Sequence, residues 1–323
     1  MTMAEGVRRA LLTGGTGYVG SHLAKRLVLE RFEVHLVVRA ESGTGLLHDV
    51  LPRLVLHEHN GSTESMDSIV KASHPDVVFH LASHFIAQHR PADLDPLVHS
   101  NLFFPLQLVD AMVRTGCYHL VNVGTNWEHF KNREYSPVCL YAATKRAFES
   151  LLAYYLETTS LRAVTLKLFD TYGPGDPRPK LFRALKEAAE SGTALKMSPG
   201  EQLVDIVHVE DVAEAFLLAA IRLLSGKVQE GTHERYAVSS GSRLCLRDLV
   251  NKYEAAIGMP IPVEWGGRPY RPREVMVPWT KGKPVPGWRP RIPLEDGLRT
   301  LFASPDMQEE SGASSAGRSG KRK

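Results

Sequence analysis

Two residues that could exchange a proton stand close together in the string YAATK (141–145). Tyr141 and Lys145 are four residues apart, so a helix places both side chains on one face. An isolated phenol, with a pKa of about 10, is a poor acid or base at neutral pH. A neighbouring ammonium favours the phenolate and lowers that pKa towards the working range. The pattern therefore predicts an acid–base pair in which Tyr141 transfers the proton and Lys145 adjusts its pKa.

A hydroxyl precedes this pair at Thr125, which follows the apolar run His119–Val123. That run has the composition of a buried strand. In doubly wound folds, ligands bind at the carboxyl ends of the strands, where Thr125 would lie. We therefore expect Thr125 to hydrogen-bond a substrate oxygen beside Tyr141 and to complete a catalytic set with Lys145.

A glycine-rich string, TGGTGYVG (13–20), begins at the end of the first apolar run. Gly14 suits a tight turn, Gly17 lets a pyrophosphate approach the backbone, and Gly20 lets a helix pack on the preceding strand. Free N–H groups at the start of that helix would bind phosphate, so the string predicts a dinucleotide-binding turn. The residues predicted to contact the dinucleotide here are Gly14, Gly17, Tyr18, Val19 and Gly20.

The end of the second predicted strand selects between two dinucleotides. An acidic residue there binds the ribose 2′-hydroxyl of NAD(H) and would repel a 2′-phosphate. The strand Glu33–Arg39 ends instead in arginine, whose guanidinium can hold a phosphate through two hydrogen bonds. The sequence therefore predicts NADP(H) as cofactor, with NAD(H) as the alternative in which Arg39 only points into solvent.

Apolar runs that alternate with amphipathic stretches must position these residues. This alternation predicts an α/β fold, a Rossmann-like doubly wound parallel sheet with a smaller α/β C-terminal substrate lobe. The expected strands are Ala10–Thr13, Glu33–Arg39, Leu54–His57, Asp76–Leu81, His119–Val123 and Arg162–Phe169. The expected helices are Val19–Glu30, Ser68–Ser73, Leu106–Arg114, Tyr141–Leu156, Lys180–Ser191 and one that starts near Val209.

The same pattern divides the chain. Residues 1–170 form the expected NADP-binding domain, to which some later segments return, and residues 171–304 form mainly the substrate-binding lobe. Residues 305–323 are rich in Ser, Gly and Lys and are expected to form a disordered tail.

Composition excludes several other classes of protein. A chain of 323 residues can bury a sufficient core without a disulfide or metal staple. Four basic residues in the last thirteen positions account for more than the net charge of +3, so no nucleic acid is expected as partner. No apolar run is long enough to cross a membrane, and three widely spaced cysteines fit a cytoplasmic protein. The fourteen histidines show no metal-ligand spacing, so no metal is expected, and His80 is interpreted as a core residue.

These motifs together resemble the extended short-chain dehydrogenase/reductase family, the group of nucleotide-sugar epimerases, dehydratases and reductases. The resemblance covers about residues 8–302 and extends to FHLAS (79–83), LKLFDTYGPGDPR (166–178), GEQLVDIVHVEDVAEA (200–215) and RPYRPRE (268–274). It implies that Thr125, Tyr141 and Lys145 are catalytic, that Lys145 holds the nicotinamide ribose, and that the protein is a homodimer. Further dinucleotide contacts implied by the resemblance are Asn60, Leu81, Ala82, Ser83, Asn101 and Tyr172. Candidate substrate contacts are His84, Asn126, Trp127, Asp170, Arg271 and Arg273.

Differences from the family pattern reduce the number of reactions that we expect of this chain. The 4,6-dehydratases follow the catalytic Thr with Asp-Glu, where this chain has Asn126-Trp127, although Glu128 lies one residue further on. Val204 stands where the family carries an arginine for the substrate diphosphate, so Arg271 or Arg273 is expected to bind that group instead.

The string GTNWEHF…YSPVCLYAATKRAFE (124–149) looks most like the nucleotide-sugar 4-ketoreductases of the CDP-abequose/CDP-paratose synthase type. That likeness implies NADPH-dependent reduction of the 4-keto group of a nucleotide-activated 4-keto-6-deoxyhexose. One alternative is a nucleotide-sugar epimerase or dehydratase that recycles its hydride internally. Another is a non-catalytic NADP-binding sensor or scaffold.

Overall fold

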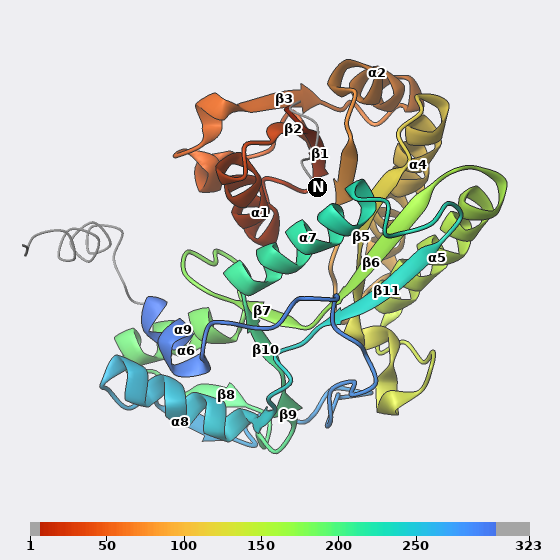
Figure 1. The fold of residues 1–323 in the computed structure, drawn as a ribbon. Coiled ribbons are helices and arrows are strands. Elements are labelled where there is room, and N and C mark those ends of the chain that lie inside the picture. Colours follow the sequence, from red (N-terminus) through yellow and green to blue (C-terminus); the bar gives the residue numbers. More distant parts are fainter. Residues whose placement is uncertain (1–6, 302–323) are drawn as a thin grey trace, which may run out of the picture.

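A seven-stranded parallel sheet forms the centre of the computed structural model, which describes residues 7–301 (Figure 1). The strand order is β11-β6-β5-β4-β1-β2-β3, so the chain proceeds outward from β1 first in one direction and then in the other. The predicted Rossmann-like fold is confirmed. The strands are β1 (Arg9–Thr13), β2 (Glu33–Val38), β3 (Leu54–Glu58), β4 (Val77–His80), β5 (His119–Thr125), β6 (Arg162–Leu168) and β11 (His233–Val238).

Helices cover both faces of this sheet, because side chains on both faces of its strands are apolar. On β1, for example, Leu12 packs in the cluster on one face and Leu11 in the cluster on the other. The first face is covered by α1 (Tyr18–Leu29) and α7 (Val209–Leu224). The second face is covered by α2 (Thr63–Ser73), α4 (Phe104–Arg114) and α5 (Leu140–Thr158).

A smaller lobe lies beyond the carboxyl ends of the central strands (Figure 1). Its core contains Tyr172, Leu185, Leu249 and Tyr253, all nearly inaccessible to solvent. Its strands pair as β7 (Asp170–Tyr172) with β10 (Ile206–His208), β8 (Leu195–Met197) with β13 (Val263–Trp265), and β9 (Leu203–Val204) with β12 (Leu244–Cys245). Its helices are α6 (Leu181–Ser191), α8 (Leu246–Ile257) and α9 (Leu294–Thr300).

The chain passes between the two parts more than once. After β7 and β10 it returns to the sheet as α7 and β11, and only then enters α8. Strand β11 was not predicted, because three of the six positions in HERYAV are polar and two of these, Glu234 and Arg235, are charged. These charges are accommodated at an edge of the sheet by ion pairs such as Arg222 to Glu234. The expected tail, residues 305–323, lies outside the described residues.

Two predicted helices begin earlier than expected. Helix α2 starts at Thr63 instead of Ser68, because the Ser62 hydroxyl accepts a hydrogen bond from Ser65 N and caps the helix. Helix α4 continues from α3 (Leu94–Val98) through the π-helical turn η4 (His99–Phe103). The shorter 3₁₀ turns are η1 (Gly45–Leu47), η2 (Leu51–Arg53), η3 (Pro91–Asp93), η5 (Asn126–Glu128) and η6 (Phe130–Asn132).

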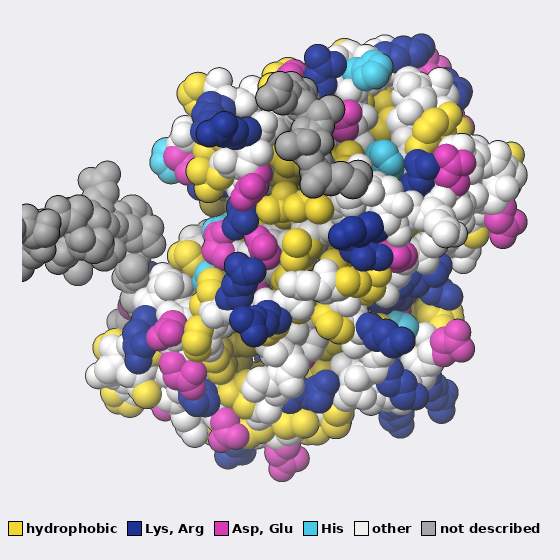
Figure 2. Space-filling view, in the orientation of Figure 1, with side chains coloured by type: hydrophobic (Ala, Val, Ile, Leu, Met, Phe, Trp, Pro, Cys, Tyr) yellow, Lys and Arg dark blue, Asp and Glu magenta, His cyan; other side chains and the backbone are white. Residues whose placement is uncertain are grey.

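On the face shown in Figure 2, Lys and Arg side chains form several separate groups with acidic side chains among them. Between residues 7 and 301, no helix combines the length and the apolar character that crossing a membrane requires. The same part of the chain holds no group of three His, Cys, Asp or Glu side chains placed to bind a metal ion.

Candidate active site

The glycine turn between β1 and α1 is closely packed against the chain that leaves β4. Gly14 has φ +72°, and a Cβ there would lie 2.6 Å from the backbone N of Ala82. A Cβ at Gly17 would meet only Gly14 O, at 3.3 Å, so the backbone is open at that point. Helix α1 has no side-chain cap and no acidic residue in its first turn, which leaves its first N–H groups for an anion. The turn therefore fits the pyrophosphate of a dinucleotide.

Arg39 and Asn60 are two further residues that the sequence predicts to contact the dinucleotide. The two residues follow neighbouring strands, since Val38 pairs with Glu58 and His59 N donates to Val38 O. Both are exposed. The Arg39 guanidinium makes an ion pair of 3.2 Å with Glu41, and its side chain is 75% exposed. An exposed pair of this kind contributes little stability, so Arg39 is free to exchange Glu41 for a phosphate.

The segment after β4 is held from behind by buried polar side chains. Thr13 Oγ1 is hydrogen-bonded to His80 Nδ1 at 2.9 Å and accepts from Ala82 N at 3.2 Å. His80 is almost fully buried, and burial lowers its pKa, which confirms its interpretation as a core residue. Asn101 accepts from His84 N and donates to Thr144, so it links this segment to α5.

The predicted catalytic residues lie at the carboxyl edge of the sheet and are all buried. Thr125 ends β5 and accepts a hydrogen bond of 3.2 Å from Trp127 N. Tyr141 and Lys145 lie in the first turns of α5, and the Ser83 hydroxyl hydrogen-bonds the Tyr141 phenol. The structure thus brings Ser83, a predicted dinucleotide contact, to the phenol itself.

The acid–base pair differs from expectation in one respect. We expected a lowered pKa for Tyr141, yet burial raises its pKa to about 12, and the Ser83 hydrogen bond only partly opposes this. The reason is the apolar surroundings, since the Phe85 ring lies edge-on to Tyr141 with centroids 4.9 Å apart. Burial lowers the pKa of Lys145 to about 8, and two carboxylates, Glu128 and Glu149, oppose that decrease.

A cavity of about 1070 Å³ lies between this edge of the sheet and the smaller lobe. Phe85 and Trp127 line it on the side of the sheet, with their ring centroids 5.7 Å apart. We call Phe85 and Trp127 the aromatic wall. The Phe85 ring also contacts Tyr141, but Thr125, Tyr141 and Lys145 do not themselves line the cavity. Of the sequence-predicted residues, Trp127, Asp170, Tyr172 and Arg271 also line the cavity.

Three other predicted substrate contacts do not line the cavity. Asn126 is buried and donates to Leu168 O at 3.0 Å, which fixes the end of β6. His84 binds Asn101 through its backbone. Arg273 has a left-handed backbone (φ +58°), donates to Ser136 Oγ, and lies over the Phe130 ring, so the structure turns it away from the cavity.

The cations that do line the cavity differ in how they are paired. Arg271 lies over the Trp127 ring and is bound by Glu274 through hydrogen bonds of 2.8 and 3.1 Å. Lys180 precedes α6, faces the Phe85 ring, and makes no ion pair with any residue in the described part of the chain. Burial lowers the pKa of Lys180. Sequence reasoning missed this lysine, whose only signal was its place just after the YGPGDPRP turn.

The YGP turn also contacts the glycine turn. The Arg178 guanidinium lies 4.5 Å from the centre of the Tyr18 ring and is held by Asp176 at 2.6 Å. Tyr172 is buried among His208 and Phe182, in the core of the smaller lobe. The two turns therefore form a continuous border between the dinucleotide site and the cavity.

A parallel sheet with this glycine turn, and a Thr, Tyr and Lys set at its carboxyl edge, defines a dinucleotide-dependent enzyme. The chain belongs to the NAD dependent epimerase/dehydratase family, whose model matches residues 10–232. The predicted membership of the extended short-chain dehydrogenases/reductases is thereby confirmed, and NAD(P) is the cofactor typical of these enzymes.

Individual relatives carry out different reactions. The chain is 28% identical to CDP-abequose synthase of Yersinia pseudotuberculosis over 282 residues, which cover 84% of this chain and 91% of that protein. It is 26% identical to UDP-glucose 4-epimerase of Mycolicibacterium smegmatis over 320 residues, covering 90% and 96%. The solved structure of Thermus thermophilus UDP-glucose 4-epimerase with NAD shares the fold, with a TM-score of 0.75 at 24% identity over 91% of this chain and 97% of that one.

Proposed function

We propose that the protein is an NADPH-dependent reductase of the 4-keto group of a nucleotide-activated 4-keto-6-deoxyhexose. The observation that carries this proposal is the aromatic wall, in which Trp127 occupies a position that holds a carboxyl group in the family's dehydratases. The next carboxylate along the sequence, Glu128, is fully buried and bound to Lys167, so it does not reach the cavity. The carboxyl pair with which the family's dehydratases eliminate water is therefore missing after Thr125, whereas a reduction needs only one acid, the role proposed for Tyr141.

The residues of the site have distinct roles in this reaction. When bound, NADPH supplies a hydride to the carbonyl carbon. Tyr141, neutral because of its raised pKa, donates a proton to the developing alkoxide, and Ser83 holds the phenol in place. The Thr125 hydroxyl hydrogen-bonds the same oxygen. Lys145 holds the ribose hydroxyls and provides positive charge beside Tyr141.

The cofactor preference rests on Arg39. Its guanidinium stands at the end of β2 and makes only an exposed ion pair with Glu41. A 2′-phosphate offers a stronger, doubly hydrogen-bonded partner than one carboxylate of an exposed pair. NADP(H) is therefore preferred over NAD(H), and the remaining predicted contacts, Asn60, Leu81, Ala82 and Asn101, serve either dinucleotide.

The substrate is proposed from the chemistry of the cavity. Lys180 and Arg271 supply positive charge for a diphosphate at the cavity wall. The aromatic wall suits a sugar that has lost a hydroxyl group, because its apolar surface removes hydrocarbon from water. The named activity of the Yersinia relative, CDP-abequose synthase, supports the same substrate class. In this arrangement the sheet part binds the cofactor and the smaller lobe binds the sugar nucleotide.

A homodimer is part of the proposal. Large apolar side chains are exposed along α3, η4 and α5, where a second copy could cover them. These side chains are Leu94, Val98, Phe103, Leu151 and Tyr154. We place the dimer in the cytoplasm, because the cysteines Cys117, Cys139 and Cys245 are all free.

The test uses purified protein, NADPH and the CDP-, dTDP-, UDP- and GDP-linked 4-keto-6-deoxyhexoses. A reductase consumes one NADPH for each sugar converted, which is read from the nicotinamide absorbance and from product analysis. An epimerase converts sugar with no net loss of NADPH, and that outcome would overturn the proposal. A protein that binds NADPH but converts none of the four sugars would also overturn it.

A further inference from the structure

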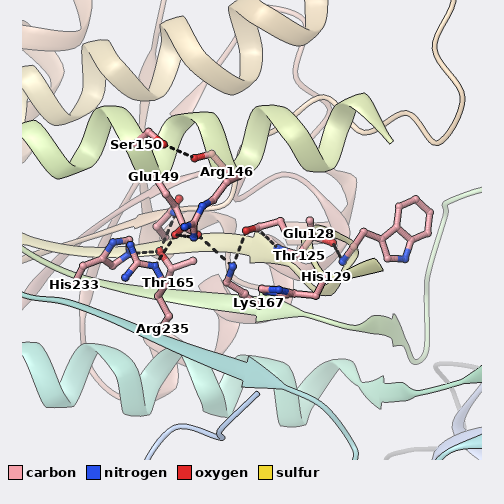
Figure 3. Close-up of polar contacts among 12 residues, drawn as sticks. Thr125, Glu128, His129, Arg146, Glu149, Ser150, Thr165, Lys167, His233 and Arg235 are labelled. Atoms are coloured by element: carbon pink, nitrogen blue, oxygen red, sulfur yellow. Dashed lines mark hydrogen bonds and ion pairs between the residues drawn. The ribbon is translucent and has the colours of Figure 1, made fainter. Parts of the chain in front are cut away.

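A buried cluster of charged side chains adjoins the catalytic set (Figure 3). It consists of Glu128 after β5, Lys167 on β6 and Glu149 on α5, and each is at most 2% exposed. We call these three residues the buried charge cluster. Burying charges is costly unless each is closely paired, so an apolar set of similar volume would be at least as stable. Stability alone therefore does not explain why charges occupy this place.

Glu128 makes two contacts, one through each carboxylate oxygen. Its Oε1 accepts a hydrogen bond of 3.2 Å from Thr125 N, and its Oε2 lies 2.6 Å from Lys167 Nζ (Figure 3). A Cβ added to Gly124 would lie 3.1 Å from Glu128 Oε1, so glycine at that position leaves room for the carboxylate. The carboxylate thus ties the backbone of the catalytic threonine to the neighbouring strand.

Lys167 depends mainly on Glu128. Its distance to Glu149 Oε1 is 3.8 Å, beyond hydrogen-bonding range. The other oxygen of Glu149 is bound by Arg235 at 2.7 Å and by Arg146 at 3.3 Å. Glu128 and Lys167 therefore form one tight pair, and Glu149 is held mostly by the two arginines.

Resting on the reductase function proposed above, we propose that Glu128 is a positioning residue of the catalytic set. Through its bond to Thr125 N it fixes the threonine hydroxyl, and with Lys167 it keeps a carboxylate beside Tyr141 and Lys145. Glu128 is fully buried and does not line the cavity, so in this proposal it acts only through these residues.

The negative charge of Glu128 raises the pKa of both Lys145 and Tyr141. Burial lowers the pKa of Lys145, and Glu128 and Glu149 oppose that decrease. Glu128 also adds to the rise in the pKa of Tyr141. Burial and Glu149 raise the pKa of Glu128 itself, but Lys167 at 2.6 Å opposes this and favours the carboxylate. Loss of the charge on Glu128 would let both Lys145 and Tyr141 release their protons at lower pH.

Other groups that face Tyr141 and Lys145 come from the surrounding elements. They are His80 on β4, Ser83 after β4, Cys139 before α5 and Glu149 on α5. His129, after η5, interacts with Lys167 of the buried charge cluster instead. Burial lowers the pKa of both histidines and raises the pKa of Cys139, so these three are neutral near pH 7. The carboxylates are thus the groups whose charge reaches the pair.

Two variants distinguish the effect of the charge on Glu128 from the effect of its hydrogen bond to Thr125 N. Glu128→Gln keeps an oxygen that can accept from Thr125 N but removes the charge. The double variant Glu128→Leu with Lys167→Met removes both charges and the acceptor, and leaves no unpaired buried ion that would unfold the protein. Glu230→Gln is the matched control, because Glu230 also forms a short ion pair, with Arg162, but lies exposed and away from the site.

Two measurements are made on each variant. The pH dependence of kcat and KM is recorded with NADPH and the sugar substrate. Separately, the titration of Lys145 is followed by NMR of lysine labelled at Cε, with Lys145→Arg identifying the signal. The second measurement needs no substrate, so failure of the proposed reaction would not be confused with failure of this inference.

We expect Glu128→Gln to move the Lys145 titration and the alkaline limb of kcat down by about one pH unit. We expect the double variant to lower kcat about a hundredfold, because Thr125 loses its fixed position, with KM changed less than threefold. Glu230→Gln should match the unmodified protein in both measurements. A Lys145 titration unchanged by Glu128→Gln, or a folded double variant with kcat within threefold of the unmodified protein, would overturn the inference.

Discussion

Lys180 Nζ lies 5.8 Å from the centre of the Phe85 ring, on the cavity wall, and makes no ion pair within residues 7–301. A half-buried ammonium without a carboxylate partner is available to an anionic ligand. We expect Lys180→Met to raise KM for the sugar nucleotide roughly ten- to a hundredfold, with little change in kcat. This is the effect expected when one charge-assisted hydrogen bond to the substrate is lost. Steady-state kinetics checks this. Lys186→Met is the control, since Lys186 lines the same cavity but pairs with Glu190, and equal effects would contradict the role of Lys180.

Removal of the phenol hydroxyl should stop proton donation without disturbing the cofactor. We expect Tyr141→Phe to lower kcat by about a thousandfold or more, the usual contribution of a placed acid. Its Kd for NADPH, measured by fluorescence titration, should stay within twofold of the unmodified value. A variant with near-normal turnover would show that another group donates the proton. Tyr135→Phe serves as control, because Tyr135 is exposed.

The buried ammonium of Lys145 makes folding stability depend on pH. The pKa of Lys145 falls from 10.5 to about 8 on folding, so the unfolded chain binds more protons between these values. The cost is therefore present in full below pH 8 and is relieved as the pH rises towards 10.5. We expect Lys145→Met to melt at a higher temperature than the unmodified protein at pH 7, by an amount that shrinks above pH 8. Thermal melts across this range check it.

The exposed Lys281 provides the comparison for that series, and Lys281→Met should show no such pH dependence. Tyr141 acts in a separate window, since its pKa rises from 10.0 to about 12 on folding. Its contribution to stability is complete below pH 10 and is lost as the pH rises to 12. A melting-temperature difference for Lys145→Met that is constant from pH 7 to 10 would contradict the assigned titration.

The choice between the two dinucleotides depends on Arg39 and its neighbour. We expect Arg39→Ala to weaken NADPH binding about tenfold or more and to leave NADH binding nearly unchanged. Glu41→Gln should act in the opposite direction, because the exposed carboxylate competes for the same guanidinium. Titration of each variant with both cofactors gives the two ratios. A preference for NADH in the unmodified protein, unaffected by Arg39→Ala, would exclude NADP(H) as the natural cofactor.

Much of the fold could be predicted because its signals are local. The glycine turn, the buried strands β1 and β4, and the long helix α5 each follow from a short stretch of sequence. Strand β11 could not be predicted this way, because its polar residues are neutralised by partners far along the chain, such as Arg235 with Glu149. Contacts between residues far apart in the chain also determine which helix covers which face of the sheet.

The candidate site could likewise be predicted where its residues lie close together in the sequence. Tyr141 and Lys145 share one helix, so their spacing was sufficient. The roles of the cations could not be predicted, because their ion pairs depend on the fold. Arg271 is bound by Glu274 and Arg273 turns away from the cavity. Lys180 lines the cavity and has no ion pair with the residues that the structure describes.

The return of α7 and β11 to the sheet has a consequence for folding. Phe216 and its neighbours on α7 cover the apolar face that Leu12 and Leu36 present. Trp288, near the end of the described chain, donates to Asp211 O on the same helix. A fragment that ends near residue 170 would lack α7, so this apolar face of the sheet would be exposed to water and the fragment would aggregate. The parallel sheet and the smaller lobe are therefore not independent folding units, and we expect the chain to unfold in one cooperative step.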